Sequence, residues 1–228
     1  MTALVTPTAD FRQQFVEFAI RQEALCFGEF KTKAGRLSPY FFNSGLFSDG
    51  ASLAKLTRFY AQAALASGLK IDTIFGPAYK GITLAAGTAI AMADMGHNRP
   101  FCYNRKEAKD HGEGGLIVGT APTGNVLIVD DVISDGASKR ESVEMILAAG
   151  ATPIGVLIAL DRQEVGAKAG STQSAAQEFN QTTGIPVIAV ATLTDIQAYL
   201  MQHTDAIPQQ SDKLEAIEAY RKRYGAAI

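Results

Sequence analysis

VLIVDDVISDGAS, from Val126 to Ser138, joins an apolar run, two acids and a loop of small residues. Its first four residues are apolar and follow a Gly124-Asn125 turn, a pattern that predicts a strand buried on both faces. The strand ends at two carboxylates, Asp130 and Asp131, and helical spacing begins at about Ala137. The apolar residues expected on the inward face of this helix, which Gly150 should end, are Val143, Ile146 and Leu147.

The loop between this strand and this helix is expected to bind an anion. Backbone N–H groups at a helix N-terminus point toward such a ligand, and Gly136 allows the backbone to approach it closely. Ser134 and Ser138 add hydroxyl donors. The two carboxylates lie where they could hold the hydroxyls of a sugar attached to the anion. The pattern therefore predicts a pocket for a ribose 5-phosphate.

Two simpler interpretations compete with this one. A buried strand ending in two Asp residues also resembles the Mg²⁺-binding strand of a P-loop NTPase, but that class needs a Gly-x4-Gly-Lys-Ser/Thr loop. The nearest candidate, Gly45 to Gly50 followed by Ala51-Ser52, lacks the lysine. The other alternative, an ordinary strand-to-helix connection whose acids only cap the helix, stays open on this pattern alone.

Composition excludes several classes of protein. The chain has 228 residues, 47% of them hydrophobic and 19% charged, which fits one globular α/β domain with additions or two small domains. A net charge of −2 without a sustained basic region argues against nucleic-acid binding through phosphate contacts. Cys26 and Cys102 form no CxxC motif or disulfide framework, so we expect a reducing, cytoplasmic setting.

No targeting or membrane segment is expected. Asp10, Arg12 and Glu17 interrupt any apolar core of a signal peptide. The longest weakly polar run, residues 82–93, is too short to span a bilayer.

The remaining segments alternate between strand and helix patterns. Residues 27–47 are rich in Gly, Pro and aromatics and indicate strands and turns. Further strands are predicted at 71–75, 101–103, 154–160 and 186–190, and helices at 49–68, 82–94, 175–179, 194–199 and 211–224. A first helix is predicted after Thr8 from the spacing of Phe11, Phe15, Phe18, Gln22 and Leu25. This alternation predicts an α/β fold with a parallel, Rossmann-like sheet.

Three further positions could carry chemistry. The glycine-containing turn 76–81 is a second possible N–H cradle, with Lys80 as a point charge, although a lone lysine is more often a surface residue. Residues 105–124 are too polar for a core and suggest either a functional loop or a solvated hairpin. Arg162 ends a strand, so its guanidinium could bind a carboxylate, or it could pair locally with Glu164.

Several segments together resemble the orotate phosphoribosyltransferases, a branch of the type I phosphoribosyltransferases. The segment 126–138 resembles their motif for 5-phosphoribosyl-1-pyrophosphate (PRPP). The other matching segments, in the order typical of the family, are Phe27-Gly28-Glu29-Phe30, Ser38-Pro39-Tyr40-Phe41-Phe42-Asn43, Phe75-Gly76-Pro77-Ala78-Tyr79-Lys80-Gly81 and NRKEAKDHGEGG at 104–115. The resemblance covers essentially the whole chain.

The resemblance implies one phosphoribosyltransferase domain over residues 1–228. Its Rossmann-like core would span about 70–195, and a small hood would be built from about 1–69 plus 196–228. It also implies transfer of ribose 5-phosphate from PRPP to orotate, which gives orotidine 5′-monophosphate and pyrophosphate in de novo pyrimidine synthesis. In this family the loop at 105–115 reaches the partner's active site, so the resemblance implies a homodimer.

The resemblance also assigns site residues. The catalytic residues would be Lys109, Asp130 and Asp131. Those binding PRPP would be Tyr79, Lys80, Arg105, Lys106, Lys109, His111, Asp130, Asp131, Val132, Ile133, Ser134, Asp135, Gly136, Ala137 and Ser138. Those binding orotate would be Lys33, Phe41, Phe42, Ser134 and Arg162, although at least one of the two adjacent phenylalanines is expected to serve only core packing.

Magnesium is the cofactor that the resemblance implies. We expect Mg²⁺ to be held by PRPP oxygens and water, without a full set of protein ligands. One departure from the family is visible: the usual Thr-Ala-Gly-Thr-Ala is here Ser134-Asp135-Gly136-Ala137-Ser138. A hydroxyl is kept at 134, lost at 137 and gained at 138, while Asp135 adds a negative charge beside the expected phosphate.

Three other functions compete with orotate phosphoribosyl transfer. A transferase of the same fold could act on another base, although Arg162, Lys33 and the hood sequence favour orotate. A PRPP-sensing regulator without catalysis is disfavoured by Arg105, Lys106 and Lys109 and by the lack of a DNA-binding segment. A response regulator usually carries its acids after the first strand, whereas these acids come after roughly half the chain.

Overall fold

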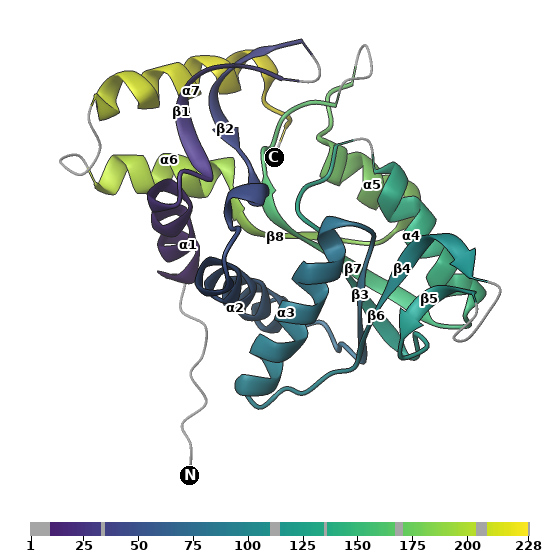
Figure 1. Ribbon diagram of the computed structural model, residues 1–228. Helices are drawn as coiled ribbons and strands as arrows, with labels where there is room; N and C mark the ends of the chain where they lie inside the picture. Colours follow the sequence, from purple (N-terminus) through teal and green to yellow (C-terminus); the bar gives the residue numbers. More distant parts are fainter. Residues whose placement is uncertain are drawn as a thin grey trace.

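A six-stranded sheet forms the centre of the protein in the computed structural model, which describes residues 10–32, 35–109, 115–134, 136–166, 171–203 and 209–227, the side chains of 10, 108 and 109 excepted (Figure 1). The strand order is β5-β4-β3-β6-β7-β8, with β5 antiparallel to β4 and all other neighbours parallel. The strands are β3 (Thr73–Gly76), β4 (Phe101–Lys109), β5 (Gly115–Gly119), β6 (Asn125–Val129), β7 (Thr152–Asp161) and β8 (Val187–Thr192). The predicted α/β class with a parallel sheet is confirmed.

Helices cover both faces of this sheet. Buried side chains of α1, α2, α3 and α6 join one apolar cluster, and those of α4 and α5 join a second cluster on the opposite face. The helices are α1 (Asp10–Arg21), α2 (Gly50–Ala66), α3 (Lys80–Asp94), α4 (Ala137–Ala148), α5 (Ala175–Thr183), α6 (Leu193–Gln202) and α7 (Gln210–Tyr224). The sheet is therefore the middle layer of three.

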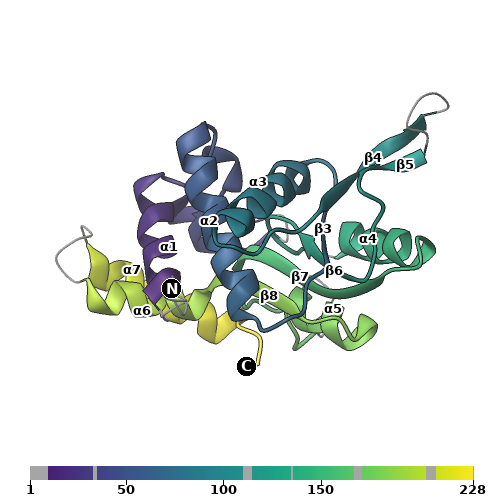
Figure 2. The same ribbon diagram turned by 90° about the horizontal axis from the view of Figure 1, so that it is seen from below.

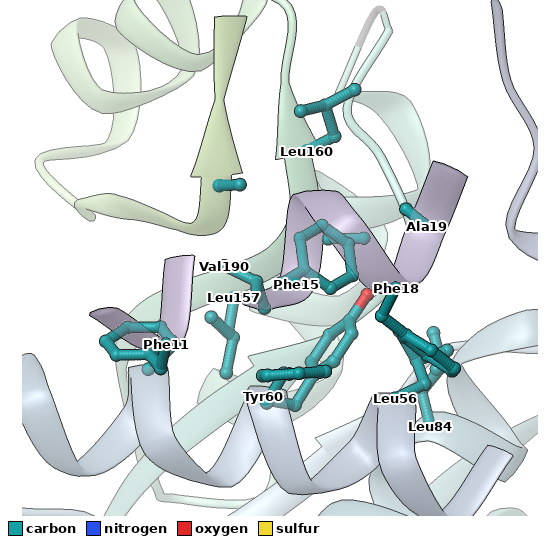
Figure 3. Close-up of a cluster of buried hydrophobic side chains, with 14 of the residues drawn as sticks. Phe11, Phe15, Phe18, Ala19, Leu56, Tyr60, Leu84, Leu157, Leu160 and Val190 are labelled. Carbon is teal, nitrogen blue, oxygen red and sulfur yellow. The ribbon is translucent and has the colours of Figure 1, made fainter. Parts of the chain in front are cut away.

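Strand β6 is buried on both faces, as its four apolar residues predict. Leu127 and Val129 belong to the cluster beneath α1 and α2, whereas Val126 and Ile128 belong to the cluster beneath α4. This division follows from the two-residue period of a strand. Figure 3 shows part of the first cluster, where Tyr60 of α2 lies among side chains of α1 and of the sheet.

A two-stranded antiparallel ribbon lies apart from the main sheet. Its strands are β1 (Leu25–Lys31) and β2 (Leu37–Phe42), followed by the short 3₁₀ helix η1 (Ser44–Leu46). Helix α7 packs on β2, where the rings of Tyr40 and Tyr220 meet edge to face at 6.4 Å (Figure 1). Segments from the two ends of the chain thus lie side by side. Helix α2, also from the first third, packs instead on α3 and the sheet.

Within the polar segment at 105–124, β4 and β5 pair as a hairpin that extends beyond the rest of the sheet (Figure 2). A hairpin is one of the two alternatives that the sequence left open for this segment. Two other expectations about the elements were wrong. The first helix ends at Arg21, so Leu25 belongs to β1 and not to the helix face. Leu147 is 56% exposed. Ile146 is the apolar residue of α4 that is fully buried, and it fills the place in the cluster beneath this helix.

Candidate functional site

Two strand-to-helix turns meet at the carboxyl ends of β3 and β6. A Cβ atom on Gly76 would lie 2.1 Å from the carbonyl oxygen of Gly81, and one on Gly81 would lie 2.8 Å from the carbonyl oxygen of Val129. Only glycine permits this close approach of backbone to backbone. The turn after β3 therefore packs directly on the end of β6, where the two acids begin. Binding crevices of parallel sheets form at this edge.

Asp131 joins the two turns through its side chain. Its Oδ2 accepts hydrogen bonds from Lys80 Nζ at 2.7 Å and from Ser44 Oγ at 2.9 Å, and its Oδ1 accepts the Val132 N–H at 2.8 Å. Burial alone would raise the pKa of this carboxyl, but the hydrogen bonds and the charge of Lys80 outweigh it and hold the pKa below the usual value. Asp131 is therefore a carboxylate at neutral pH.

Asp130 lies deeper, with 7% of its surface exposed. Its Oδ2 forms a short ion pair with Lys139 Nζ, its Oδ1 accepts the Asp131 N–H at 2.9 Å, and its carbonyl accepts the Tyr60 hydroxyl at 2.9 Å. Burial raises the pKa of Asp130, and the ammonium group of Lys139 acts in the opposite direction. Two adjacent acids thus occupy different environments.

The predicted anion-binding loop leads into α4. Gly136 is the N-cap of that helix, at a φ of +73°, and its carbonyl accepts the Arg140 N–H at 2.9 Å. Because Gly136 has no side chain, it cannot supply a capping oxygen to α4. The first N–H groups of the helix therefore face the loop without a cap from residue 136. Ser134 is exposed and Ser138 is half-buried, while Asp135 lies outside the described residues.

Positive charge adjoins the turn after β3. The Nζ of Lys106 lies 4.9 Å from the ring centre of Tyr79, which is 68% exposed, and the Ala78 N–H donates to Asn104 Oδ1 at 2.8 Å. Strand β4 therefore fixes the turn and brings its own lysine there. Arg105 precedes this lysine on the same strand. Lys109 ends β4, but its side chain lies outside the described part, as does His111.

Arg162 forms the local pair with Glu164 that the sequence left as an alternative. Its Nε donates to Glu164 Oε1 at 2.8 Å, its Nη2 donates to Ser38 Oγ at 2.9 Å, and its guanidinium stacks 4.3 Å above the Tyr40 ring. Glu164 also accepts hydrogen bonds from the hydroxyls of Tyr40 and Tyr220. This acid therefore links the ribbon, α7 and the segment after β7.

The two adjacent phenylalanines of β2 separate, as expected. Phe42 packs in the core against Phe15 and Phe47, at ring distances of 6.3 and 6.5 Å. Phe41 is 46% exposed and stacks on Phe30 at 5.5 Å. Of these two rings, only that of Phe41 therefore offers an open face. Lys33 lies outside the described residues.

Sequence reasoning missed four residues of this region: Ser44, Tyr60, Lys139 and Glu164 in its linking role. Ser44 is 87 positions from its partner Asp131, and Tyr60 is 70 positions from Asp130, so no local pattern marks them. Lys139 does carry a signal. A lysine in the first turn of a helix faces the unfavourable end of the helix dipole, which suggests a nearby anion.

Neither a metal cluster nor a membrane span is found in the part of the chain that the structure describes. Within those residues no group of three or more His, Cys, Asp or Glu side chains is placed to hold a metal ion. None of the helices drawn in Figure 1 is both long and apolar enough to cross a bilayer.

Comparisons with known proteins agree with this geometry. Residues 45–173 match the family model described as "Phosphoribosyl transferase domain". The orotate phosphoribosyltransferase of Nitrosospira multiformis is 58% identical over 220 residues, which covers 96% of this chain and 93% of the relative. That of Cupriavidus necator is 58% identical over 219 residues, covering 95% and 96%.

A solved structure gives the same result. The crystal structure of orotate phosphoribosyltransferase from Francisella tularensis matches with a TM-score of 0.82 and 38% identity, covering 93% of this chain and all of that one. The similarity in sequence and the similarity in fold thus both extend over nearly the whole chain. The chain belongs to the orotate phosphoribosyltransferases, within the phosphoribosyltransferase family.

Proposed function

We propose that this protein transfers the ribose 5-phosphate of PRPP to orotate, giving orotidine 5′-monophosphate and pyrophosphate in de novo pyrimidine synthesis. The relatives named above support the reaction. The observation that carries it is the meeting of two turns at Asp131, which is held between Lys80 and Ser44 beside the loop that opens α4. A ribose that carries a phosphate at one end and a pyrophosphate at the other would fit such a site, with an anion at each turn and the carboxylate at the sugar hydroxyls between them.

The proposed mechanism begins at the phosphate loop. The N–H groups at 134–138 would anchor the 5′-phosphate, so that binding energy far from the reacting atom orients ribose C1. As the bond from C1 to the pyrophosphate oxygen breaks, the ring gains positive charge, and N1 of orotate then bonds to C1 and gives up its proton to the pyrophosphate or to water. Asp130 and Asp131 would hold the ribose hydroxyls, and their negative charge favours this cationic ring.

The departing pyrophosphate gains negative charge that cations must neutralise. Lys80 belongs to the turn after β3, and Lys106 of β4 lies beside that turn, with Arg105 next to it in the strand. Lys109 and His111 come later in the sequence. We assign Lys109 the main role, as stabiliser or proton donor of the leaving group. Mg²⁺, when bound with PRPP, would supply further neutralisation of the phosphate oxygens.

The site's carboxylates fit a metal that arrives with its substrate. Asp130 already pairs with Lys139, and Asp131 already accepts from Lys80 and Ser44. These acids therefore have few lone pairs left for a fully protein-held metal. We propose that Mg²⁺ is bound mainly through PRPP and water.

Orotate would bind beneath the ribbon. The planar ring would lie near Phe41, and the carboxylate would be recognised by Arg162 together with Lys33, with Ser134 at the sugar side. Because Glu164 already holds Arg162 Nε and Ser38 accepts from Nη2, the guanidinium would offer orotate mainly its Nη1 group. We also propose a cytoplasmic homodimer in which residues 105–115 of one subunit reach the active site of the other.

A direct assay tests the reaction. Orotate and PRPP are mixed with the protein with and without Mg²⁺, and the loss of orotate absorbance is followed. We expect turnover with magnesium and little without it. A panel containing uracil, hypoxanthine and adenine under the same conditions tests the base. Turnover of another base in preference to orotate, or none with orotate, would overturn the proposal.

A further inference from the structure

A lysine is buried directly behind the acidic pair. The side chain of Lys139 is only 6% exposed, although it belongs to the first turn of α4. Burying an ammonium group is costly unless it is paired, and a cation in the first turn also opposes the helix dipole. This position is therefore unfavourable for a lysine unless an anion compensates it. Asp130 supplies that anion.

The ammonium group of Lys139 connects three consecutive segments. It contacts Asp130 Oδ2 at the end of β6, donates to the carbonyl of Val132 at 2.7 Å in the loop, and lies 3.3 Å from Ser138 Oγ at the start of α4. An ammonium group has three N–H donors, and each has a partner here. One side chain therefore fixes the strand end, the loop and the helix start relative to one another.

The two acids are consequently held by different cations. The second oxygen of Asp130 accepts the Asp131 N–H at 2.9 Å, so each oxygen has one partner within the protein and a further lone pair for a substrate hydroxyl. Asp131 instead turns to Lys80, whose side chain is 56% exposed and comes from the other turn. The buried pair of Asp130 and Lys139 is thus a fixed support. The more accessible pair of Asp131 and Lys80 faces the crevice.

We infer that Lys139 is a positioning residue for phosphoribosyl transfer, which orients Asp130 and holds Val132 and Ser138, on either side of the phosphate-binding turn, relative to one another. This inference rests on the proposed function. Lys139 touches no substrate in this scheme, because it acts through Asp130 and the loop. Its loss should therefore affect PRPP more than orotate.

Steady-state kinetics of Lys139→Met test the inference. Methionine keeps most of the apolar length and removes the charge, and Lys70→Met, at an exposed lysine, is the control. We expect the KM for PRPP to rise about tenfold, with a smaller change for orotate and none in the control. If Lys139→Met does not fold, Lys139→Gln, which retains a donor for Val132, replaces it.

The pH profile separates positioning from mere stability. The charged or titratable groups around Asp130 are Lys139, Asp131 with its partner Lys80, and the hydroxyl of Tyr60. Lys139 lowers the pKa of Asp130, so its removal should move the acid limb of kcat/KM for PRPP to higher pH. A lower melting temperature with an unchanged acid limb and unchanged KM for PRPP would overturn the inference.

A double variant checks that Lys139 acts through Asp130. In an Asp130→Asn background, the Lys139→Met change should alter the KM for PRPP far less than it does alone. Fully additive effects would contradict the inference. A wild-type protein without turnover of orotate and PRPP would instead remove the proposed function, so the two failures are distinguishable.

Discussion

Asp130 and Asp131 are adjacent and chemically identical, yet the fold gives them opposite electrostatic settings. The pKa of Asp130 is raised by burial, whereas at Asp131 the hydrogen bonds and charge from Lys80 and Ser44 outweigh burial and lower the pKa. The sequence locates both acids because they end an apolar strand. It does not distinguish them, because the partners that do so come from elsewhere in the chain.

Replacing Asp131 with Asn should slow chemistry more than it weakens PRPP binding. Asparagine keeps the shape but removes the charge that favours a cationic ribose ring, so we expect kcat to fall by about tenfold or more. Single-turnover rates and direct PRPP titration measure the two effects separately. A change in PRPP affinity alone would contradict the electrostatic role.

The same variant should lose stability in a pH-dependent way. A carboxyl whose pKa is lowered in the folded state stabilises the protein above its unfolded pKa, and that contribution disappears as the pH falls through the folded pKa. Because Lys80 is half exposed, we expect Asp131→Asn to cost about 1 kcal/mol near neutral pH. Urea unfolding at about pH 7 and about pH 3 should show the difference shrinking in acid; a constant difference would disagree.

Glu164 should matter for both stability and orotate binding. Replacing it with Ala leaves Arg162 partly buried without its carboxylate, which should cost about 3 kcal/mol in the free energy of unfolding and raise the KM for orotate. Glu164→Gln should cost less because it keeps an acceptor. Glu144→Ala on the exposed side of α4 is the control. An unchanged orotate KM in a folded Glu164→Ala protein would show that this acid does not orient Arg162.

At the scale of elements, local patterns predicted the buried and capped segments well. Strand β6 and helix α4 fall where the apolar run and the helical spacing place them. The hairpin stayed one of two alternatives because the outer half of β4, Arg105–Lys109, is polar and carries no alternating apolar face. Its pairing comes from the partner strand, through Tyr103 opposite Val118 and Asn104 opposite Ile117.

The turn between β3 and α3 should tolerate no side chain at Gly81. A methyl group there would lie 2.6 Å from the Pro77 ring and 2.8 Å from the Val129 carbonyl, so Gly81→Ala should destabilise the fold by about 2 kcal/mol or more. Gly50→Ala is the matched control, because its Cβ meets nothing within 4 Å in the first turn of α2. Thermal unfolding of both variants decides; equal melting temperatures would contradict the packing.

At the scale of the whole molecule, contacts between distant segments set what sequence patterns could not. Alternating strands and helices indicated a parallel sheet, but not the order β5-β4-β3-β6-β7-β8. The same holds for the site. Ser44 and Asp131 are 87 positions apart, and Tyr40 and Glu164 are 124 apart, so the acids were predictable and their partners were not.

Mixing two impaired variants tests the proposed dimer. If residues 105–115 act in the partner's site, combining Lys109→Ala with Asp131→Asn subunits restores one complete site in each mixed dimer. Random mixing should then recover activity in about a quarter of the sites. The separate variants, unmixed, are the control. A mixture no more active than the average of its two components would mean that the segment acts within its own subunit.

A crystal structure of the protein with orotidine 5′-monophosphate would show the binding site itself. We predict that the phosphate accepts hydrogen bonds from the backbone N–H groups at 134–138. The ribose hydroxyls should donate to the carboxylates of Asp130 and Asp131, and the base should lie beneath the ribbon near Phe41. A phosphate bound elsewhere, with those N–H groups left unengaged, would contradict it.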